Sequence, residues 1–256
     1  MRMIDLNADM GESFGDWRMG ADDALLEVIT SANIACGFHA GDWDVMAHAM
    51  EGAVARGTGI GAHPGFPDLQ GFGRRRMDMT LTSAANMVRY QLGAAQAMAR
   101  AAGGRVRHLK LHGALANMAA ENEALARACF EAALGVDPDL ILTVIAGTRQ
   151  QAAAQALGAR AACEIFADRA YNPDATLVDR RKPGAVLHDP DAIARRVLAM
   201  LDAGAILAED GTRIPTRIDT ICVHGDTAEA VAIARTLRAR LEDAGFTLAP
   251  PAGETL

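Results

Sequence analysis

Two short stretches of the chain alternate apolar residues with polar residues that could do chemistry. Their polar members are Asp5, Asn7 and Asp9 in the first stretch, and His108, Lys110 and His112 in the second. In an extended strand, a period of two sends such a set to one face. Burying polar groups without partners costs about 2–7 kcal/mol each. We therefore expect both sets to face a ligand, a cation or a hydrogen-bond network.

Histidines mark the ends of several other apolar stretches. Four of the seven histidines lie within two residues of a glycine: His39, His63, His112 and His224. Glycine allows a sharp turn and a close approach of the backbone to a ligand. Imidazole transfers protons and binds metal ions near neutral pH. A single such histidine is more often structural, but four at the ends of predicted strands favour one shared site.

Further charged residues follow the last two predicted strands. Glu164 and Asp168 share one face of a strand and its continuation, Arg169 comes next, and Asp226 follows His224. Carboxylates and imidazoles are the usual general acids and bases of enzymes. The carboxyl ends of parallel barrel strands converge on one rim, so we expect these residues to join the histidines there.

Cationic residues are distributed unevenly by type. Arginine outnumbers lysine 23 to 2. The two lysines, Lys110 and Lys182, therefore either occupy positions that need a compact ammonium group or remain by compositional chance. The glycine- and proline-rich segment 61–76 ends in three consecutive arginines. Such a triplet could hold a phosphate or a carboxylate through paired hydrogen bonds, or it could be a solvated turn.

Composition excludes several classes of protein. The formal net charge of −7 argues against a surface built for nucleic acid or for an anionic membrane. The sequence contains neither a P-loop nor a dinucleotide-binding fingerprint. Its four cysteines are widely separated, which disfavours a disulfide scaffold or a zinc ribbon. Without a signal-like or membrane-spanning apolar segment, we expect a cytoplasmic protein.

The elements that must position these groups alternate between strands and helices, which is typical of an α/β fold with a parallel sheet. The predicted strands are Met3–Ala8, Asn33–Gly37, Gly57–Ala62, Arg107–His112, Leu140–Ala146, Ala162–Phe166 and Asp219–His224. The predicted helices are Asp42–Arg56, Leu81–Ala102, Ala114–Leu134, Ala192–Ala203 and Ala228–Ala244. In 256 residues this pattern predicts a single (β/α) barrel domain, 1–256, of about seven parallel strands. A doubly wound open sheet is the alternative.

Local signals refine this outline at two places. Asp189 followed by Pro190 predicts the start of a helix, because the carboxylate caps it and proline suits the first turn. The segment Ile206–Ile214 contains Asp210-Gly211, which predicts a hairpin.

The motifs at the strand ends resemble those of the LamB/YcsF family, which is described as the A component of bacterial 5-oxoprolinase. The matching segments are Asp5–Gly15, Ser31–Asp42, Gly61–Asp68, Lys110–Leu115, Glu164–Tyr171, Arg181–Val186 and Cys222–Asp226. The resemblance implies a barrel similar to the glycoside hydrolase/deacetylase fold. It also implies ATP-dependent opening of 5-oxo-L-proline to L-glutamate, together with subunits B and C.

The resemblance has two local departures and one further implication. Leu111 and Ala116 stand where the family usually has proline and tyrosine, which affects the local backbone and the contacts of that tyrosine. The fold also includes metal-dependent deacetylases that use one aspartate and two histidines. Asp5, His39 and His63 could imitate that set. The resemblance implies ATP as a cofactor, whereas a divalent metal is left open and no bound metal is claimed.

Two groups of site residues follow from the motifs and the resemblance. The expected catalytic residues are Asp5, Asp9, His63, Lys110, His112 and Asp168. The expected substrate-binding residues are Asn7, His39, Glu164, Arg169, His224 and Asp226. In this hypothesis Asp9 or Asp168 is the general base, and Lys110 and Arg169 hold carboxylate or phosphoryl oxygens.

Two other functions fit the same residues. One is a metal-dependent deacetylase or carbohydrate hydrolase that needs no ATP. The other is a regulatory subunit that binds a small lactam without converting it.

Overall fold

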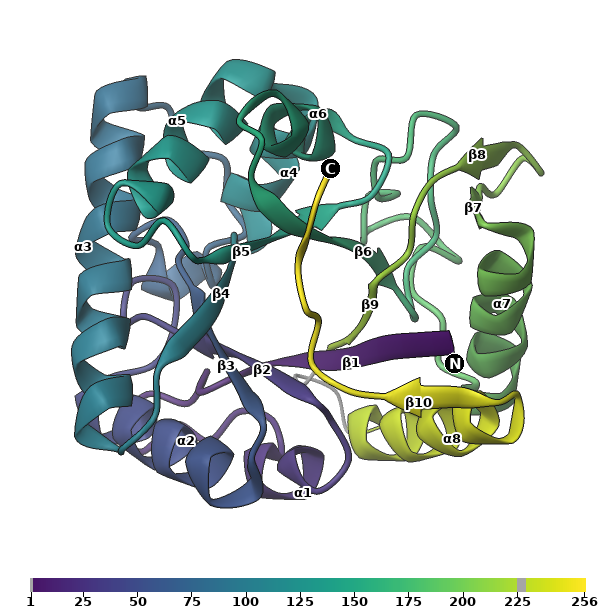
Figure 1. The fold of residues 1–256 in the computed structure, drawn as a ribbon, viewed down its shortest axis with the longest axis horizontal. Helices are drawn as coiled ribbons and strands as arrows, with labels where there is room; N and C mark the ends of the chain where they lie inside the picture. Colours follow the sequence, from purple (N-terminus) through teal and green to yellow (C-terminus); the bar gives the residue numbers. More distant parts are fainter. Residues whose placement is uncertain (1, 225–228) are drawn as a thin grey trace.

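Seven parallel strands close into a barrel in the computed structural model, which describes residues 2–224 and 229–256 (Figure 1). The barrel strands are β1 (Arg2–Met10), β2 (Ser31–Ala35), β3 (Gly59–His63), β4 (Val106–Lys110), β5 (Ile141–Ile145), β6 (Arg160–Phe166) and β9 (Thr220–Val223). They pair in this order, and β9 pairs with both β6 and β1. This closure confirms the predicted barrel and excludes the open sheet. All seven predicted strands are present, with ends that differ by at most two residues.

Helices surround the barrel and cover its outer face (Figure 1). They are α1 (Asp22–Leu26), α2 (Trp43–Arg56), α3 (Leu81–Ala101), α4 (Gly113–Glu121), α5 (Glu123–Leu134), α6 (Arg149–Ala156), α7 (Pro190–Ala203) and α8 (Ala230–Asp243), with the 3-10 turn η1 (Leu69–Gly71). The Asp189 carboxylate caps α7, as predicted, by accepting hydrogen bonds from the Asp191 and Ala192 amides. None of the described helices is both long and apolar enough to span a lipid bilayer.

The predicted helix Ala114–Leu134 is wrong as a single element, because the chain breaks at Asn122. Asn122 has an extended backbone (φ −129°, ψ 104°), and its side chain accepts a hydrogen bond from the Leu125 amide. Asparagine competes with helix continuation through such local bonds, so it ends α4 and caps α5. The alanine-rich segments on both sides of Asn122 continue the helical pattern, so the periodicity did not predict this break.

Four short strands of the described residues lie outside the barrel closure. β7 (Ala205–Leu207) and β8 (Arg213–Pro215) form the antiparallel hairpin that the sequence predicts. Two further strands were not predicted: β10 (Phe246–Leu248), which pairs with the start of β1, and β11 (Glu254–Thr255), which pairs with β6. The C-terminal segment therefore crosses the barrel at the amino ends of the strands (Figure 1). The opposite end is left to the βα loops.

The interior of the barrel is polar, although its outer layer is apolar. On β1, the apolar residues Ile4, Leu6, Ala8 and Met10 belong to the core between strands and helices. Inside, the Asn7 amide donates to Glu164 Oε1 at 3.0 Å and to Thr220 Oγ1 at 2.7 Å, and Asn33 donates to Asn7 at 2.7 Å. The alternation on β1 thus separates the two faces as predicted, and the inward groups satisfy one another.

Gly61 has no side chain, which leaves room for the His108 ring in the interior of the barrel. A Cβ built on Gly61 would lie 2.1 Å from His108 Nε2. We expect Gly61→Ala to destabilise the protein by about 3 kcal/mol, because a well-packed interior cannot absorb the overlap. Gly93→Ala is the control, because its Cβ would meet nothing within 4 Å on an exposed face of α3. It should raise stability by up to about 1 kcal/mol. Urea unfolding measures both, and equal effects would contradict the packing argument.

Candidate functional site

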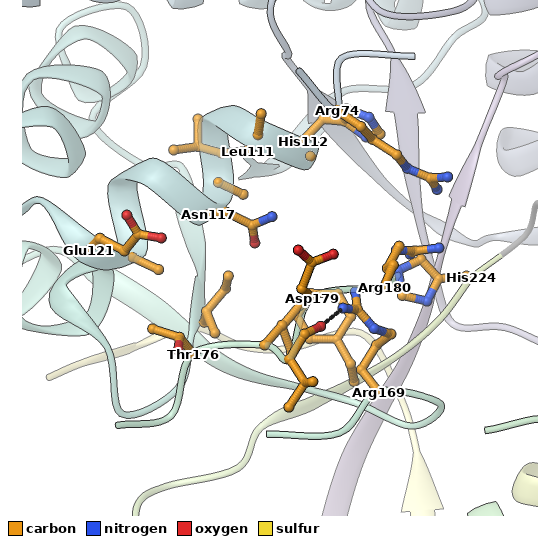
Figure 2. Close-up of a pocket in the computed structure, with 18 of the residues that line it drawn as sticks. Arg74, Leu111, His112, Asn117, Glu121, Arg169, Thr176, Asp179, Arg180 and His224 are labelled. Atoms are coloured by element: carbon orange, nitrogen blue, oxygen red, sulfur yellow. Dashed lines mark hydrogen bonds between the residues drawn. The ribbon is translucent and has the colours of Figure 1, made fainter. Parts of the chain in front are cut away.

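A cavity of about 850 Å³ opens at the carboxyl ends of the strands (Figure 2). Its lining includes predicted site residues from five strands or their continuations: Asp9, His63, Lys110, His112, Arg169 and His224. Asn7, His39, Glu164 and Asp168 are buried close behind it, as their contacts below show. Asp226 lies outside the described residues. The structure thus brings most of the predicted residues together around one opening.

Lys110 occupies the centre of this arrangement in a cage of acidic groups. Its Nζ lies 2.8 Å from Glu164 Oε1 and 3.0 Å from both Asp9 Oδ1 and Cys222 Sγ, and the residue is 4 % exposed. Burial alone would lower the pKa of Lys110, but the neighbouring carboxylates hold it well above its usual value. A fixed ammonium group therefore stands at the floor of the cavity.

Asp9 links Lys110 to the histidines. Its Oδ1 accepts from Lys110 and from the Asn33 amide, and its Oδ2 lies 3.3 Å from His63 Nε2. Burial would raise the pKa of Asp9, but His63 and Lys110 lower it well below the ordinary value. An anion this strongly stabilised is a weak base, so the geometry favours a charge-balancing role for Asp9 over proton abstraction.

Three imidazoles and one carboxylate pack together at the ends of β1 to β4. We call Glu12, His39, His63 and His112 the histidine centre; their possible ligand atoms all lie within 4.8 Å of one another. The rings of His39 and His112 stack with centroids 3.6 Å apart, and His63 stands edge-on to both. Burial and the neighbouring imidazoles hold the pKa of His39 and His112 well below the usual value, so both rings are neutral.

Glu12 was not among the predicted site residues, and the prediction that Asp5 lies beside these histidines is wrong. Among the described residues, the carboxylate that groups with His39 and His63 is that of Glu12. Glu12 lies two residues beyond the end of β1, where the alternation that marked Asp5 and Asp9 no longer applies. Its place in the Asp5–Gly15 motif was the available signal.

Asp5 lies deeper in the barrel. Its carboxylate accepts hydrogen bonds from the hydroxyls of Thr30, Ser31 and Thr220, at 2.6, 2.8 and 2.5 Å. It pairs in register with Thr220, the first residue of β9, and it is not part of the cavity lining. Burial raises the pKa of Asp5 to about 6.

This raised pKa predicts a pH-dependent difference in stability between the protein and its Asp5→Asn variant. Below about pH 4 the carboxyl is neutral in both the folded and the unfolded chain, so its full contribution is present. Between about pH 4 and 6 only the unfolded chain releases the proton, so stability relative to Asp5→Asn falls by roughly 3 kcal/mol. Urea unfolding across this range measures the difference. A difference that does not change with pH would contradict the buried-carboxyl account.

Asp168 and His224 form a dyad close to Asp9 and Cys222. His224 Nδ1 lies 2.8 and 2.9 Å from the two oxygens of Asp168, and Phe166 stacks on the imidazole. Burial would raise the pKa of Asp168, but His224 lowers it below the ordinary value. Since a carboxylate only accepts, Nδ1 carries a proton, and in a neutral imidazole the lone pair is then on Nε2. His224 lines the cavity, so its imidazole can act there as a base when it is neutral, with Asp168 holding its tautomer.

Guanidinium groups form one wall of the cavity. Figure 2 shows Arg74, Arg169 and Arg180 on the side where His224 lies, with Asn117 opposite. Arg169 donates to the Val178 carbonyl at 2.6 Å, so it also anchors the loop that carries Arg180. Burial lowers the pKa of Arg169 to about 10, which leaves it charged at neutral pH.

The predicted arginine triplet divides between two tasks. Arg74 and Arg76 line the cavity, whereas Arg75 is not part of the lining and pairs with Asp68. Arg76 is also tied to Glu121, at 2.5 Å. The triplet is therefore not one anion-binding group. Lys182 also lines the cavity. So does Leu111, which stands where the family usually has proline and adds no polar group.

A closed (β/α) barrel with buried acids, bases and cations at the carboxyl ends of its strands is the architecture of barrel enzymes. The chain belongs to the LamB/YcsF family, because the model of that family matches residues 4–255.

Comparisons with individual proteins agree with this membership. A relative from Ruegeria pomeroyi, named as the A component of 5-oxoprolinase, is 62% identical over 248 residues, which cover 97% of this chain and 98% of the relative. The crystal structure of a lactam utilization protein from Thermus thermophilus superposes with a TM-score of 0.90 at 41% identity, covering 96% and 99% of the two chains. The catalytic domain of a peptidoglycan N-acetylglucosamine deacetylase from Eubacterium rectale shares the fold alone, with a TM-score of 0.51 at 11% identity over 97% of this chain and 88% of that domain.

Proposed function

We propose that this chain is the lactam-opening component of an ATP-dependent 5-oxoprolinase that works with subunits B and C in the cytoplasm. Its substrate is 5-oxo-L-proline, which is opened to L-glutamate while ATP is hydrolysed to ADP and phosphate. The name of the Ruegeria relative, at 62% identity over nearly the full chain, supports this reaction. The observation that carries it is the convergence of Lys110, Asp9 and the Asp168–His224 dyad on one cavity.

Lactam hydrolysis needs both activation and proton transfer, because amide resonance weakens the carbonyl and nitrogen leaves poorly. Transfer of the ATP γ-phosphoryl group to the lactam oxygen removes that resonance. A first water then adds its oxygen to the carbonyl carbon, the ring C–N bond breaks, and the nitrogen takes a proton. A second water releases phosphate from the resulting acyl phosphate. The balance is one lactam, one ATP and two waters to glutamate, ADP and phosphate.

His224 serves as the base in the water addition. Its Nε2 lone pair is available because Asp168 accepts the proton of Nδ1. Positioned general bases contribute about 10²–10⁴ in rate. Lys110 also lines the cavity, where an ammonium group stabilises negative charge that develops on oxygen.

The cationic wall suits the anionic parts of the reactants. Arg74, Arg169 and Arg180 supply guanidinium groups beside His224, and such groups bind carboxylate and phosphoryl oxygens in pairs. A cavity of about 850 Å³ exceeds what a five-membered lactam fills, which leaves room for phosphoryl groups at this wall. We assign the substrate carboxylate and the transferred phosphoryl group to it.

Reconstitution tests the proposed function. This chain is mixed with subunits B and C, ATP and 5-oxo-L-proline, and glutamate and phosphate are measured together. We expect equal amounts of both products, and neither product when this chain or ATP is omitted. Lactam opening that proceeds equally well without this chain would overturn the proposal, as would hydrolysis of an acetylated sugar by this chain without ATP.

A further inference from the structure

The histidine centre has a chemistry that lactam opening does not use. Its four side chains come from the ends of four neighbouring strands, and each is less than 8 % exposed. Imidazole nitrogens with one carboxylate oxygen form the donor set that proteins use for Zn²⁺ and similar divalent transition metals. Mg²⁺ and Ca²⁺ instead prefer oxygen ligands.

Hydrogen bonds to backbone carbonyls fix the tautomers of two of these rings. His63 Nδ1 lies 2.8 Å from the Lys110 carbonyl, and His112 Nε2 lies 2.9 Å from the Phe72 carbonyl. A carbonyl oxygen only accepts, so both of these nitrogens carry hydrogen. In metal sites a ligating histidine donates its other ring N–H to a carbonyl or carboxylate in the same way.

The remaining nitrogens of these rings face each other. His63 Nε2 and His112 Nδ1 are 3.0 Å apart, and in neutral rings with the tautomers above both carry lone pairs. Two lone pairs at that distance repel unless a cation lies between them. A metal ion satisfies both nitrogens without adding a proton.

The separations suit one ion. Two ligands at about 2.0 Å from a tetrahedral ion are about 3.3 Å apart. The two facing nitrogens are 3.0 Å apart, and Glu12 Oε1 lies 3.7 Å from His112 Nδ1. An ion binds in the plane of the imidazole that holds it, so the stacked rings of His39 and His112 cannot both take it as they lie.

His39 and two glycines complete the site. Among the described residues, neither ring nitrogen of the buried His39 has a hydrogen-bond partner, and its Nε2 lies 3.6 Å from Glu12 Oε1. A Cβ on Gly65 would lie 2.6 Å from His39 Nδ1, and one on Gly73 would lie 2.9 Å from His112 Cδ2. The backbone is thus fitted closely around the rings.

We propose that His63 Nε2, His112 Nδ1 and the Glu12 carboxylate bind one divalent transition metal ion of the Zn²⁺ type. His39 is a positioning residue that stacks on His112. Two of the three proposed ligand residues, His63 and His112, also line the cavity. The site does not depend on the lactam reaction, so it can be tested on the isolated chain.

The test is metal binding by tag-free protein that has been treated with a chelator and dialysed. Titration with Zn²⁺ by calorimetry should give one site with a Kd below about 1 μM. Co²⁺ should give the visible absorption of a tetrahedral complex. His63→Gln, His112→Gln and Glu12→Gln should each weaken Zn²⁺ binding at least ~100-fold. His48→Gln is the matched control, because His48 is exposed and pairs with Asp23 on the surface.

A second group of possible ligands must be distinguished from the histidine centre in this test. Asp9, Cys222 and His224 also have ligand atoms within 4.8 Å of one another. Cys222→Ser should leave the affinity for Zn²⁺ within threefold, and circular dichroism should show that each variant is folded. The proposal is overturned if Cys222→Ser abolishes binding while His63→Gln does not. It is also overturned if folded wild-type protein binds Zn²⁺ no better than His63→Gln.

Discussion

The Asp168→Asn variant is expected to lose about 10³–10⁴-fold in turnover of 5-oxoproline while it keeps its fold. Both oxygens of Asp168 face His224 Nδ1, at 2.8 and 2.9 Å. An asparagine amide can present its NH₂ group there instead, which makes Nδ1 the acceptor and places the proton on Nε2. The base then points a hydrogen at the water that it should deprotonate, and losses of this size follow such tautomer errors.

The reconstituted complex gives the measurement, and a double variant separates this mechanism from general damage. If Asp168 acts only through His224, then Asp168→Asn should have little further effect when His224 is already glutamine. Fully additive losses, or a single variant that retains more than a tenth of the activity, would contradict the dyad. Thermal unfolding of each variant checks that the barrel is intact.

Lys110→Met is expected to cost about 3–5 kcal/mol of folding free energy and to abolish lactam opening. The ammonium group lies 2.8 Å from Glu164 and 3.0 Å from Asp9, both buried. Without it, the two carboxylates lose the ammonium group that they share, and a buried charge that loses its partner carries a penalty of this size. Burial already raises the pKa of Glu164, which shows how little solvent stabilises it.

Urea unfolding measures this loss, and the other lysine supplies the control. Lys182 is exposed, so Lys182→Met should change stability by no more than about 0.5 kcal/mol. Adding Glu164→Gln to Lys110→Met should restore part of the stability, because it removes one of the two opposed charges. If the double variant is less stable than Lys110→Met alone, the cage is not held by charge balance.

Period-two alternation explains why the barrel could be predicted from the sequence. On β1 it separates the outward Leu6 and Ala8 from the inward Asn7 and Asp9, and the barrel strands lie within two residues of their predicted bounds. Alternation gives the face of a side chain but not its depth. Asp5 and Asp9 share a face, yet Asp5 pairs in register with the first residue of β9 and Asp9 reaches the cavity.

The sequence pattern of single strands could not predict which side chains of the site pair with one another. Asp168 and His224 are 56 residues apart, and only the pairing of β6 with β9 brings them together. The same limit hid the pairing of Arg75 with Asp68, which removes one arginine from the expected anion site. Glu12 was hidden because it lies past the end of its strand.

A crystal structure of the reconstituted complex with 5-oxo-L-proline and a non-hydrolysable ATP analogue would decide where the lactam is opened. We expect the lactam carbonyl at the mouth of the barrel, with its carbon one water molecule away from His224 Nε2 and its carboxylate on the arginine wall. A lactam bound between the other subunits, with this cavity filled by solvent alone, would contradict the proposed mechanism.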